Sequence, residues 1–336
     1  MTRLGRILKT AVAIPVSAAA AVGVARLVNG RRYPTPHGFP DDLGNPERYS
    51  LDQPGMKITR LHGDYLNGFD LAPSPQTREG LIVIWGGSEG GPDFNRAVRL
   101  ASQGYRVLSL FYFGQPNQQP RLAGVPLEFF EEVLAWRDEN AADGPLTVIG
   151  TSRGAELALV LQARYAQIDN VVVYSPTRYA WQGLDFRHEQ SSWSWHGAPV
   201  PYVSFRNAST ESSTRMFWAM LTNTPIPLRM QYASAAVNDQ RSEAARIPFM
   251  LSGNLLAFAG DDDAMWPSER AAEYWAQFAP GRTEAHVFAG AGHLFGPLEG
   301  WAGGYQMGGS WGANQAAMVE SNAILDARLA AWHPVR

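Results

Sequence analysis

A serine between two glycines stands in the stretch Gly150-Thr151-Ser152-Arg153-Gly154. The residues before it are apolar and β-branched, as in a buried strand, and those after it are good helix formers. Gly-x-Ser-x-Gly at such a junction predicts a nucleophile elbow, a strained turn that lifts a serine hydroxyl above the sheet. The alternative is an ordinary turn in which Ser152 caps the helix.

A histidine that could act as the base lies much later, in Gly290-Ala291-Gly292-His293. It follows a predicted final strand at 284–288, and the glycines leave its loop free to reach the serine. A serine hydroxyl is a poor nucleophile near neutral pH and needs a general base within hydrogen-bond distance. We therefore predict His293 as the base. His62 lies too early in the chain to fit the order of a triad.

Three aspartates, Asp261, Asp262 and Asp263, follow a predicted buried strand at 254–259. A catalytic histidine needs a carboxylate on its other ring nitrogen to fix the tautomer and to stabilise the imidazolium. We predict Asp263 for this role, because the turn after Gly260 should point its side chain towards the histidine. Asp262 is the alternative, and Asp261 is expected to face solvent or cap the turn.

A glycine-rich loop, Gly86–Gly91, directly follows an apolar run at 81–85. Its backbone N–H groups could face a negative oxygen. The loop lacks the ending of a phosphate-binding loop and the spacing of a dinucleotide fingerprint. We predict an oxyanion hole made by the N–H groups of Ser88 and Arg153; the alternative for the loop is a tight turn only.

The elements that must position these residues alternate along the chain. Strands are predicted at 56–61, 65–71, 81–85, 105–112, 170–174, 254–259 and 284–288, with a further strand and helix within 146–159. Helices are predicted at 95–103, 126–140, 269–278 and 315–332. This alternation predicts an α/β fold with a mostly parallel, doubly wound sheet, led by an antiparallel hairpin.

Residues 178–246 interrupt the alternation and are rich in aromatic side chains. An insertion of this length predicts a cap or lid whose rings line an acyl or aromatic pocket. The alternative is a small aromatic core that only supports the domain. His188 and His196 lie in this insertion without spaced partners, so we interpret them as structural residues and predict no metal site.

The N-terminal segment, 1–30, combines basic residues with an apolar run at 11–25 and predicts a secretory signal or a membrane anchor. Fifteen helical residues reach about 22 Å, less than a hydrocarbon core of roughly 30 Å, which argues against a full span. Membrane association or export is favoured, and a leader on a cytoplasmic protein is the alternative. Residues 31–54 are predicted to be a linker, and 55–336 one catalytic domain.

The composition narrows the classes of function. The chain has 336 residues, a net charge of −3 and no cysteine. These values argue against nucleic acid as the main partner and exclude disulfides, thiolate metal sites and a cysteine nucleophile. No cofactor is expected.

Several motifs together resemble one family, the acyl-CoA thioesterase and bile acid-CoA:amino acid N-acyltransferase group of α/β-hydrolases, in its C-terminal catalytic domain. They are the stretches at 150–159, 191–202, 260–268, 290–293 and 308–310. The order Ser152, Asp263, His293 is also that of α/β-hydrolases.

The resemblance implies a serine hydrolase that cleaves an acyl thioester through an acyl-enzyme. The acyltransferase branch uses a cysteine nucleophile, so Ser152 favours hydrolysis. A carboxylesterase acting on esters without CoA, and transfer of the acyl group to an amine or alcohol, remain open alternatives.

Overall fold

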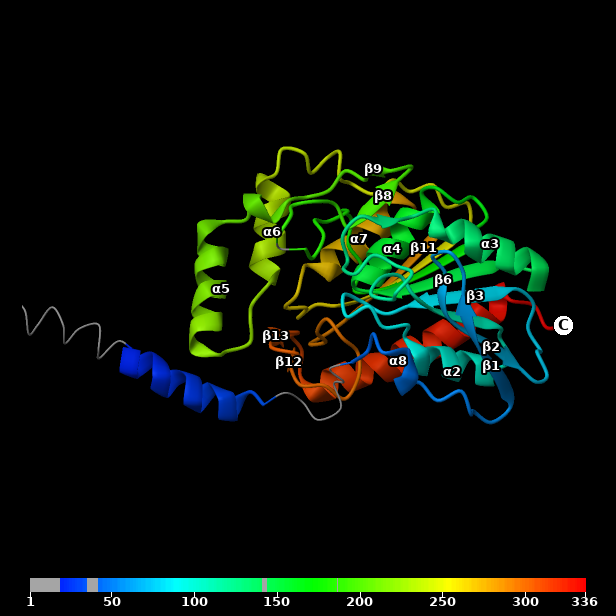
Figure 1. The fold of residues 1–336 in the computed structure, drawn as a ribbon, viewed down its shortest axis with the longest axis horizontal. Coiled ribbons are helices and arrows are strands. Elements are labelled where there is room, and N and C mark those ends of the chain that lie inside the picture. Colours follow the sequence, from blue (N-terminus) through cyan, green and yellow to red (C-terminus); the bar gives the residue numbers. More distant parts are fainter. Residues whose placement is uncertain (1–18, 35–41, 141–143, 186) are drawn as a thin grey trace, which may run out of the picture.

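The computed structural model describes residues 19–34, 42–140, 144–185 and 187–336. Most of the predicted N-terminal signal or anchor, residues 1–18, lies outside the described residues. Figure 1 shows a central sheet with helices on both faces and an insertion to one side. Among the described residues, no helix combines the length and apolar character needed to cross a membrane.

The central sheet has eight strands in the order β1-β2-β4-β3-β6-β7-β10-β11. They are β1 (Met56–His62), β2 (Asn67–Pro73), β3 (Leu81–Trp85), β4 (Val107–Phe111), β6 (Leu146–Thr151), β7 (Asn170–Tyr174), β10 (Asn254–Gly260) and β11 (Thr283–Phe288). β1 and β2 form the predicted antiparallel hairpin, β2 pairs antiparallel with β4, and every other pair is parallel. The predicted α/β-hydrolase fold is confirmed.

Helices cover both faces of the sheet, as a doubly wound fold requires (Figure 1). They are α2 (Phe94–Ser102), α3 (Phe129–Asn140), α4 (Arg153–Gln162), α7 (Ser268–Phe278) and α8 (Trp311–Trp332). One buried cluster joins the sheet to α3, α4 and α7, and a second joins the opposite face to α2 and α8. The strands of the middle, such as Leu81–Trp85, are buried on both faces.

The predicted helix at 126–140 begins later than expected. Val125 and Pro126 form a short strand, β5, which pairs with β8 (Trp193–Trp195) of the insertion. The N–H of Leu127 donates to the carbonyl of Ser194 at 3.0 Å, which continues the pairing up to the helix. A contact between residues distant in sequence thus overrides the local helical pattern.

The insertion contains β8, β9 (Ala198–Pro199), η2 (Phe205–Asn207), α5 (Thr210–Thr222) and α6 (Arg229–Asn238). Its buried rings Tyr179, Trp181 and Tyr232 pack with Trp266 in a small separate cluster, and Trp193 belongs to the main core. These buried rings form a small supporting core, as the alternative describes, and the cap over an acyl or aromatic pocket stays a prediction. The indole N–H groups have partners inside the protein: Trp181 Nε1 donates to Thr177 Oγ1 at 2.8 Å, and Trp193 Nε1 donates to Glu156 Oε1 at 2.7 Å.

The predicted linker also differs from the expectation. The helix that starts within the N-terminal segment runs through residue 32. Pro46–Arg48 form a short 3-10 helix, η1, and Tyr49 packs against Phe69 and Phe94 at ring distances of 5.5 and 5.0 Å. This part of the linker covers the sheet because an aromatic ring there buries apolar area. A two-stranded hairpin, β12 (Trp301–Ala302) and β13 (Tyr305–Gln306), precedes α8.

Candidate active site

The turn between β6 and α4 holds Ser152 in a strained conformation, with φ 56° and ψ −116°. A side chain on Gly150 would place its Cβ 2.1 Å from the carbonyl oxygen of Gly154. A side chain on Gly154 would place its Cβ 2.0 Å from the carbonyl oxygen of Gly86. Both glycines are therefore required by backbone contacts, as the elbow pattern predicts.

Ser152, His293 and Asp263 form a continuous chain of hydrogen bonds. Ser152 Oγ lies 2.8 Å from His293 Nε2, and His293 Nδ1 lies 2.9 Å from Asp263 Oδ2. The three side chains come from turns after β6, β11 and β10, which leave the sheet at the same edge. All are buried, with exposed fractions of 7%, 3% and 1%. This arrangement can pass a proton from the hydroxyl to the imidazole.

The carboxylate of Asp263 is fixed by donors from its own turn. Oδ1 accepts the N–H groups of Met265 and Trp266, at 2.8 and 3.2 Å, and Oδ2 accepts the hydroxyl of Ser268 at 2.5 Å. These bonds hold the charged form in one orientation towards the histidine. Sequence reasoning did not identify Ser268, although a hydroxyl five residues after the acid was visible as a candidate.

The neighbouring aspartates have different partners. Asp261 Oδ1 accepts the N–H of Gly290 at 2.6 Å, and Asp262 Oδ2 accepts the N–H of Gly309 at 2.9 Å. Both residues are exposed. They tie the acid turn to the adjacent loops, and neither contacts His293. The geometry therefore distinguishes Asp263 from its alternative Asp262.

The backbone of the histidine loop is also held on both sides. The N–H of His293 donates to the carbonyl of Met307 at 2.7 Å, and its own carbonyl accepts the hydroxyl of Ser175 at 2.5 Å. The Trp266 ring meets the imidazole edge-on, with 5.4 Å between centroids. The imidazole thus approaches the serine from a fixed position.

The loop after β3 lies against the elbow because the sheet register pairs Trp85 with Gly150. The hydroxyl of Tyr112 donates to the carbonyl of Gly87 at 2.5 Å. Burial raises the pKa of Tyr112 well above its usual value, so this donor keeps its proton. Ser88, the predicted oxyanion residue, is exposed in this loop. Arg153 starts α4, where backbone N–H groups have no partner within the helix.

Glu89 is a feature of this loop that sequence reasoning missed. Its Oε1 accepts the N–H of Gly87 at 2.7 Å, and a Cβ on Gly87 would lie 2.8 Å from Oε2 and 3.3 Å from Ser152 Cβ. The residue is exposed as a whole, but its carboxylate folds back onto the glycines beside the nucleophile. Loss of hydration there raises the pKa of Glu89, and hydrogen bonds from the loop backbone only partly oppose this.

A buried ion pair anchors the insertion to the elbow helix. Arg153 Nη1 lies 2.6 Å from Glu156 Oε2, and the two side chains are 2% and 0% exposed. The other oxygen of Glu156 accepts from Trp181 N and Trp193 Nε1 at 2.8 and 2.7 Å. Burial raises the pKa of Glu156, and the Arg153 charge offsets part of that rise. The signal in the sequence that could have pointed to this buried pair is Glu156 itself, an acidic residue within a mostly apolar helix.

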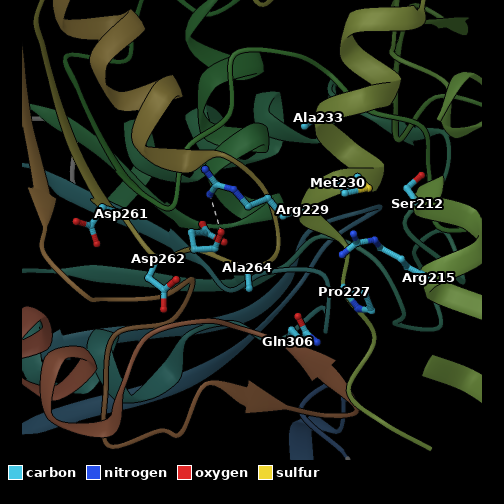
Figure 2. A pocket seen from close by; sticks show the side chains of 11 residues that line it. Ser212, Arg215, Pro227, Arg229, Met230, Ala233, Asp261, Asp262, Ala264 and Gln306 are labelled. Carbon is cyan, nitrogen blue, oxygen red and sulfur yellow. Dashed lines mark hydrogen bonds between the residues drawn. The ribbon is translucent and has the colours of Figure 1, made fainter. Parts of the chain in front are cut away.

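A pocket of about 530 Å³ lies between the insertion and the acid turn. Figure 2 shows Arg215 and Arg229 on the insertion side and Asp261 and Asp262 across from them. Arg229 Nη1 donates to the carbonyl of Asp263 at 2.6 Å and also pairs with Glu269. Burial alone would lower the pKa of Arg229, but the bonds to Glu269 raise it above its usual value.

The pocket is lined by Asp263 and not by Ser152 or His293. It therefore meets the triad from the side of the acid.

The chain matches one protein family. Residues 125–297, just over half of the chain, match the family described as BAAT / Acyl-CoA thioester hydrolase C terminal. The matched region contains the elbow, the insertion, the acid turn and the histidine loop.

Individual relatives agree with this match. Mouse acyl-coenzyme A amino acid N-acyltransferase 1 is 32% identical over 118 residues, which is 34% of this chain and 28% of the relative. Mouse bile acid-CoA:amino acid N-acyltransferase is 29% identical over 140 residues, 41% of this chain and 33% of the relative. Human acyl-coenzyme A thioesterase 1 is 24% identical over 243 residues, 71% of this chain and 52% of the relative. The chain spans about half or less of the length of these relatives.

Solved structures are similar at a lower level. An esterase from Pyrococcus furiosus has a TM-score of 0.47 at 14% identity, with 86% of this chain and 94% of that chain covered. The carboxylesterase CesB from Bacillus subtilis has a TM-score of 0.44 at 12% identity, with 92% and 97% covered. At these TM-scores the likeness carries no argument beyond the topology described above.

Proposed function

Because the chain belongs to the BAAT / acyl-CoA thioester hydrolase C-terminal family, we propose that it is a serine hydrolase acting on acyl thioesters. The observation that carries the proposal is the unbroken hydrogen-bond chain from Ser152 through His293 to Asp263. A thiolate is a good leaving group, and a buried triad suits attack on the acyl carbon of a thioester.

The proposed reaction has two steps. In the first, His293 Nε2 takes the hydroxyl proton while Ser152 Oγ attacks the carbonyl carbon, and the proton then passes to the leaving sulfur. In the second, His293 takes a proton from water, whose oxygen attacks the acyl carbon; the bond from that carbon to Ser152 Oγ then breaks, and His293 returns the proton to Oγ as the free acid leaves. Asp263 holds the tautomer and stabilises the imidazolium in both steps.

The oxyanion needs donors on the side away from the histidine. We assign this role to the N–H of Arg153 and to the Gly86–Gly91 loop, with Ser88 as the loop donor. Support comes from the register that places this loop beside the elbow and from Tyr112, which fixes the orientation of the peptide between Gly87 and Ser88.

Two other activities use the same acyl-enzyme. A carboxylesterase would release an alcohol in place of a thiol. An acyltransferase would pass the acyl group to an amine, and four of the matched relatives carry amino acid N-acyltransferase names. Here the nucleophile position holds serine, which favours water as the acceptor.

The proposal is tested with a panel of acyl-CoAs and simple acyl esters, each with and without an added amine acceptor. We expect free acid and free thiol from the acyl-CoAs, loss of turnover in Ser152→Ala, and no change in Ser102→Ala, a surface serine on α2. Covalent labelling by a fluorophosphonate that survives in Ser152→Ala would contradict the assignment of the nucleophile. An acylated amine as the main product would favour transfer over hydrolysis.

A further inference from the structure

Two neighbouring helices expose large apolar side chains on the outside of the molecule. On α5 these are Phe217, Trp218 and Met220, and on the helix of residues 19–32 they are Val24, Leu27 and Val28. Each is between 52% and 69% exposed. Scattered apolar residues are normal on a surface, but six on two adjoining elements form a patch that calls for a partner. These six residues are called the outer face below.

Hydrogen bonds join the two helices into one unit. Arg26 Nη1 donates to the carbonyls of Met220 and Leu221, both at 3.0 Å, and Asn29 Nδ2 donates to that of Thr222 at 2.8 Å. The final carbonyls of a helix lack partners within it, so a guanidinium there is favourable. Figure 1 shows the N-terminal helix meeting one end of α5, on the side of the molecule away from the sheet.

The charged residues of the N-terminal helix of the outer face are all basic. Residues 19–32 contain Arg26, Arg31 and Arg32 and no acidic residue, and the sequence before them adds only basic charges. The chain as a whole has a net charge of −3, so the positive charge is concentrated at this end. On α5, Arg215 is neutralised by Glu211 at 2.8 Å.

We propose that the outer face docks on the surface of a lipid bilayer that contains anionic headgroups. Phenylalanine and tryptophan side chains with flanking arginines are the composition that favours the interface of such a bilayer. The helices lie on the surface and do not span it. A second copy of this chain fits less well, because a symmetric contact would bring the same arginines together.

Helix α5 carries part of the outer face and also lines the pocket, so docking would act on a wall of the pocket. Ser212 and Arg215 on α5 line the pocket beside the acid turn, and Ser212 Oγ donates to Gln231 of α6 at 2.8 Å. The helix that would meet the bilayer is therefore the helix that walls the pocket. The docking itself does not depend on the proposed reaction, and its test uses no substrate.

The experiment measures binding of the full chain to vesicles by co-sedimentation. We expect little binding to phosphatidylcholine alone and strong binding when phosphatidylglycerol is included, with a loss at high salt. Arg31→Gln with Arg32→Gln should weaken binding by roughly tenfold or more. Phe217→Ser, Trp218→Ser and Met220→Ser together should weaken it by a similar factor.

The matched control is Val237→Ser with Val319→Ser, two residues 84% and 61% exposed outside the outer face, which should leave binding unchanged. Circular dichroism and thermal unfolding should show that every variant is folded. Full binding by the triple α5 variant would overturn the proposal, because residues 1–18 alone would then account for the attraction. Failure of the wild type to bind anionic vesicles, or a dimer that the triple variant abolishes, would also overturn it.

Discussion

Two arginine–glutamate pairs, one on α4 and one on α5, have the same chemistry in opposite surroundings. Arg153 and Glu156 are 2% and 0% exposed; besides the bond between them, their side chains bond to Gln182, Ser192, Trp181 and Trp193, which ties the elbow to the insertion. Arg215 and Glu211 are 60% and 63% exposed and form an ion pair within one helix. The same pair of residue types therefore links two parts of the structure on α4 and is a solvated surface ion pair on α5.

The difference separates the molecule into two regions. Around α4 the polar groups are buried and paired, so geometry near Ser152 is strongly determined. Around α5 few side chains are buried, with only Ser212 and Ala219 in that class, so little fixes the helix to the domain. The predictions below test changes near Ser152 and on α5, most of them against a matched change at a position of contrasting burial.

The largest effect is expected at the acid turn. Asp263→Asn should lower kcat by on the order of 10⁴-fold, because an amide can hold His293 in the wrong tautomer. Asp262→Asn, its exposed neighbour, should change kcat by less than about threefold, an effect of the size usual for surface positions. Steady-state kinetics on one acyl thioester checks both, and equal losses in the two variants would contradict the assignment.

The buried ion pair should have the next largest effect, on stability. Glu156→Gln leaves the Arg153 charge uncompensated and should cost about 3–5 kcal/mol in the free energy of unfolding. Glu211→Gln, the matched change on α5, should cost less than about 1 kcal/mol. Urea unfolding measures both values. A similar small loss in the two variants would mean that the burial of the α4 pair has no energetic consequence.

A smaller effect on rate is expected from Glu89. The pKa of this carboxyl is raised, so it is neutral below that pKa and ionised above it. When ionised, it should oppose a developing oxyanion and hold the N–H of Gly87. Glu89→Gln should therefore react with a fluorophosphonate faster than the wild type at alkaline pH, on the order of tenfold. This change in rate is smaller than the loss caused by removing one oxyanion-hole donor.

The pH dependence of that reaction gives the control. Below the raised pKa the wild type and Glu89→Gln should react at similar rates, because both side chains are then neutral. A variant that is slower at every pH would show that the carboxylate assists the reaction.

The smallest effect is expected on α5. Trp218→Ala removes a ring that is 52% exposed and should change the free energy of unfolding by no more than about 0.5 kcal/mol. Trp193→Ala removes a fully buried ring bonded to Glu156 and should cost about 3–5 kcal/mol. Thermal unfolding compares them. If Trp218→Ala were as costly, α5 would be more firmly packed than its exposure indicates.

The sequence was sufficient to predict the sheet, its leading hairpin and three side chains that the fold brings within hydrogen-bond distance. Those residues are marked locally, since Ser152, Asp263 and His293 each follow a strand in a turn rich in glycine or aspartate. Parallel strands then place such turns at one edge without further information.

Long-range contacts account for what could not be predicted. Glu89 lies beside the nucleophile only because its loop folds back, and the helix at 126–140 starts late because β8 captures its first residues. The rings of the insertion were correctly identified as a distinct group, but their partners decide whether they line a pocket or fill a core. Trp181 donates its backbone N–H to Glu156, and Trp193 donates its indole N–H to the same carboxylate. Neither bond can be recognised from the spacing of residues in the sequence.

The main-chain contacts at the elbow limit which substitutions can affect the position of Ser152. Gly154 leaves room only for the carbonyl of Gly86, so the distance between the Ser152 turn and the Gly86–Gly91 loop is set by a contact of main chain with main chain. Substitutions that reshape the pocket can therefore change its lining without moving Ser152 relative to that loop. For the proposed hydrolase, this means that selectivity and chemistry can diverge independently on this scaffold.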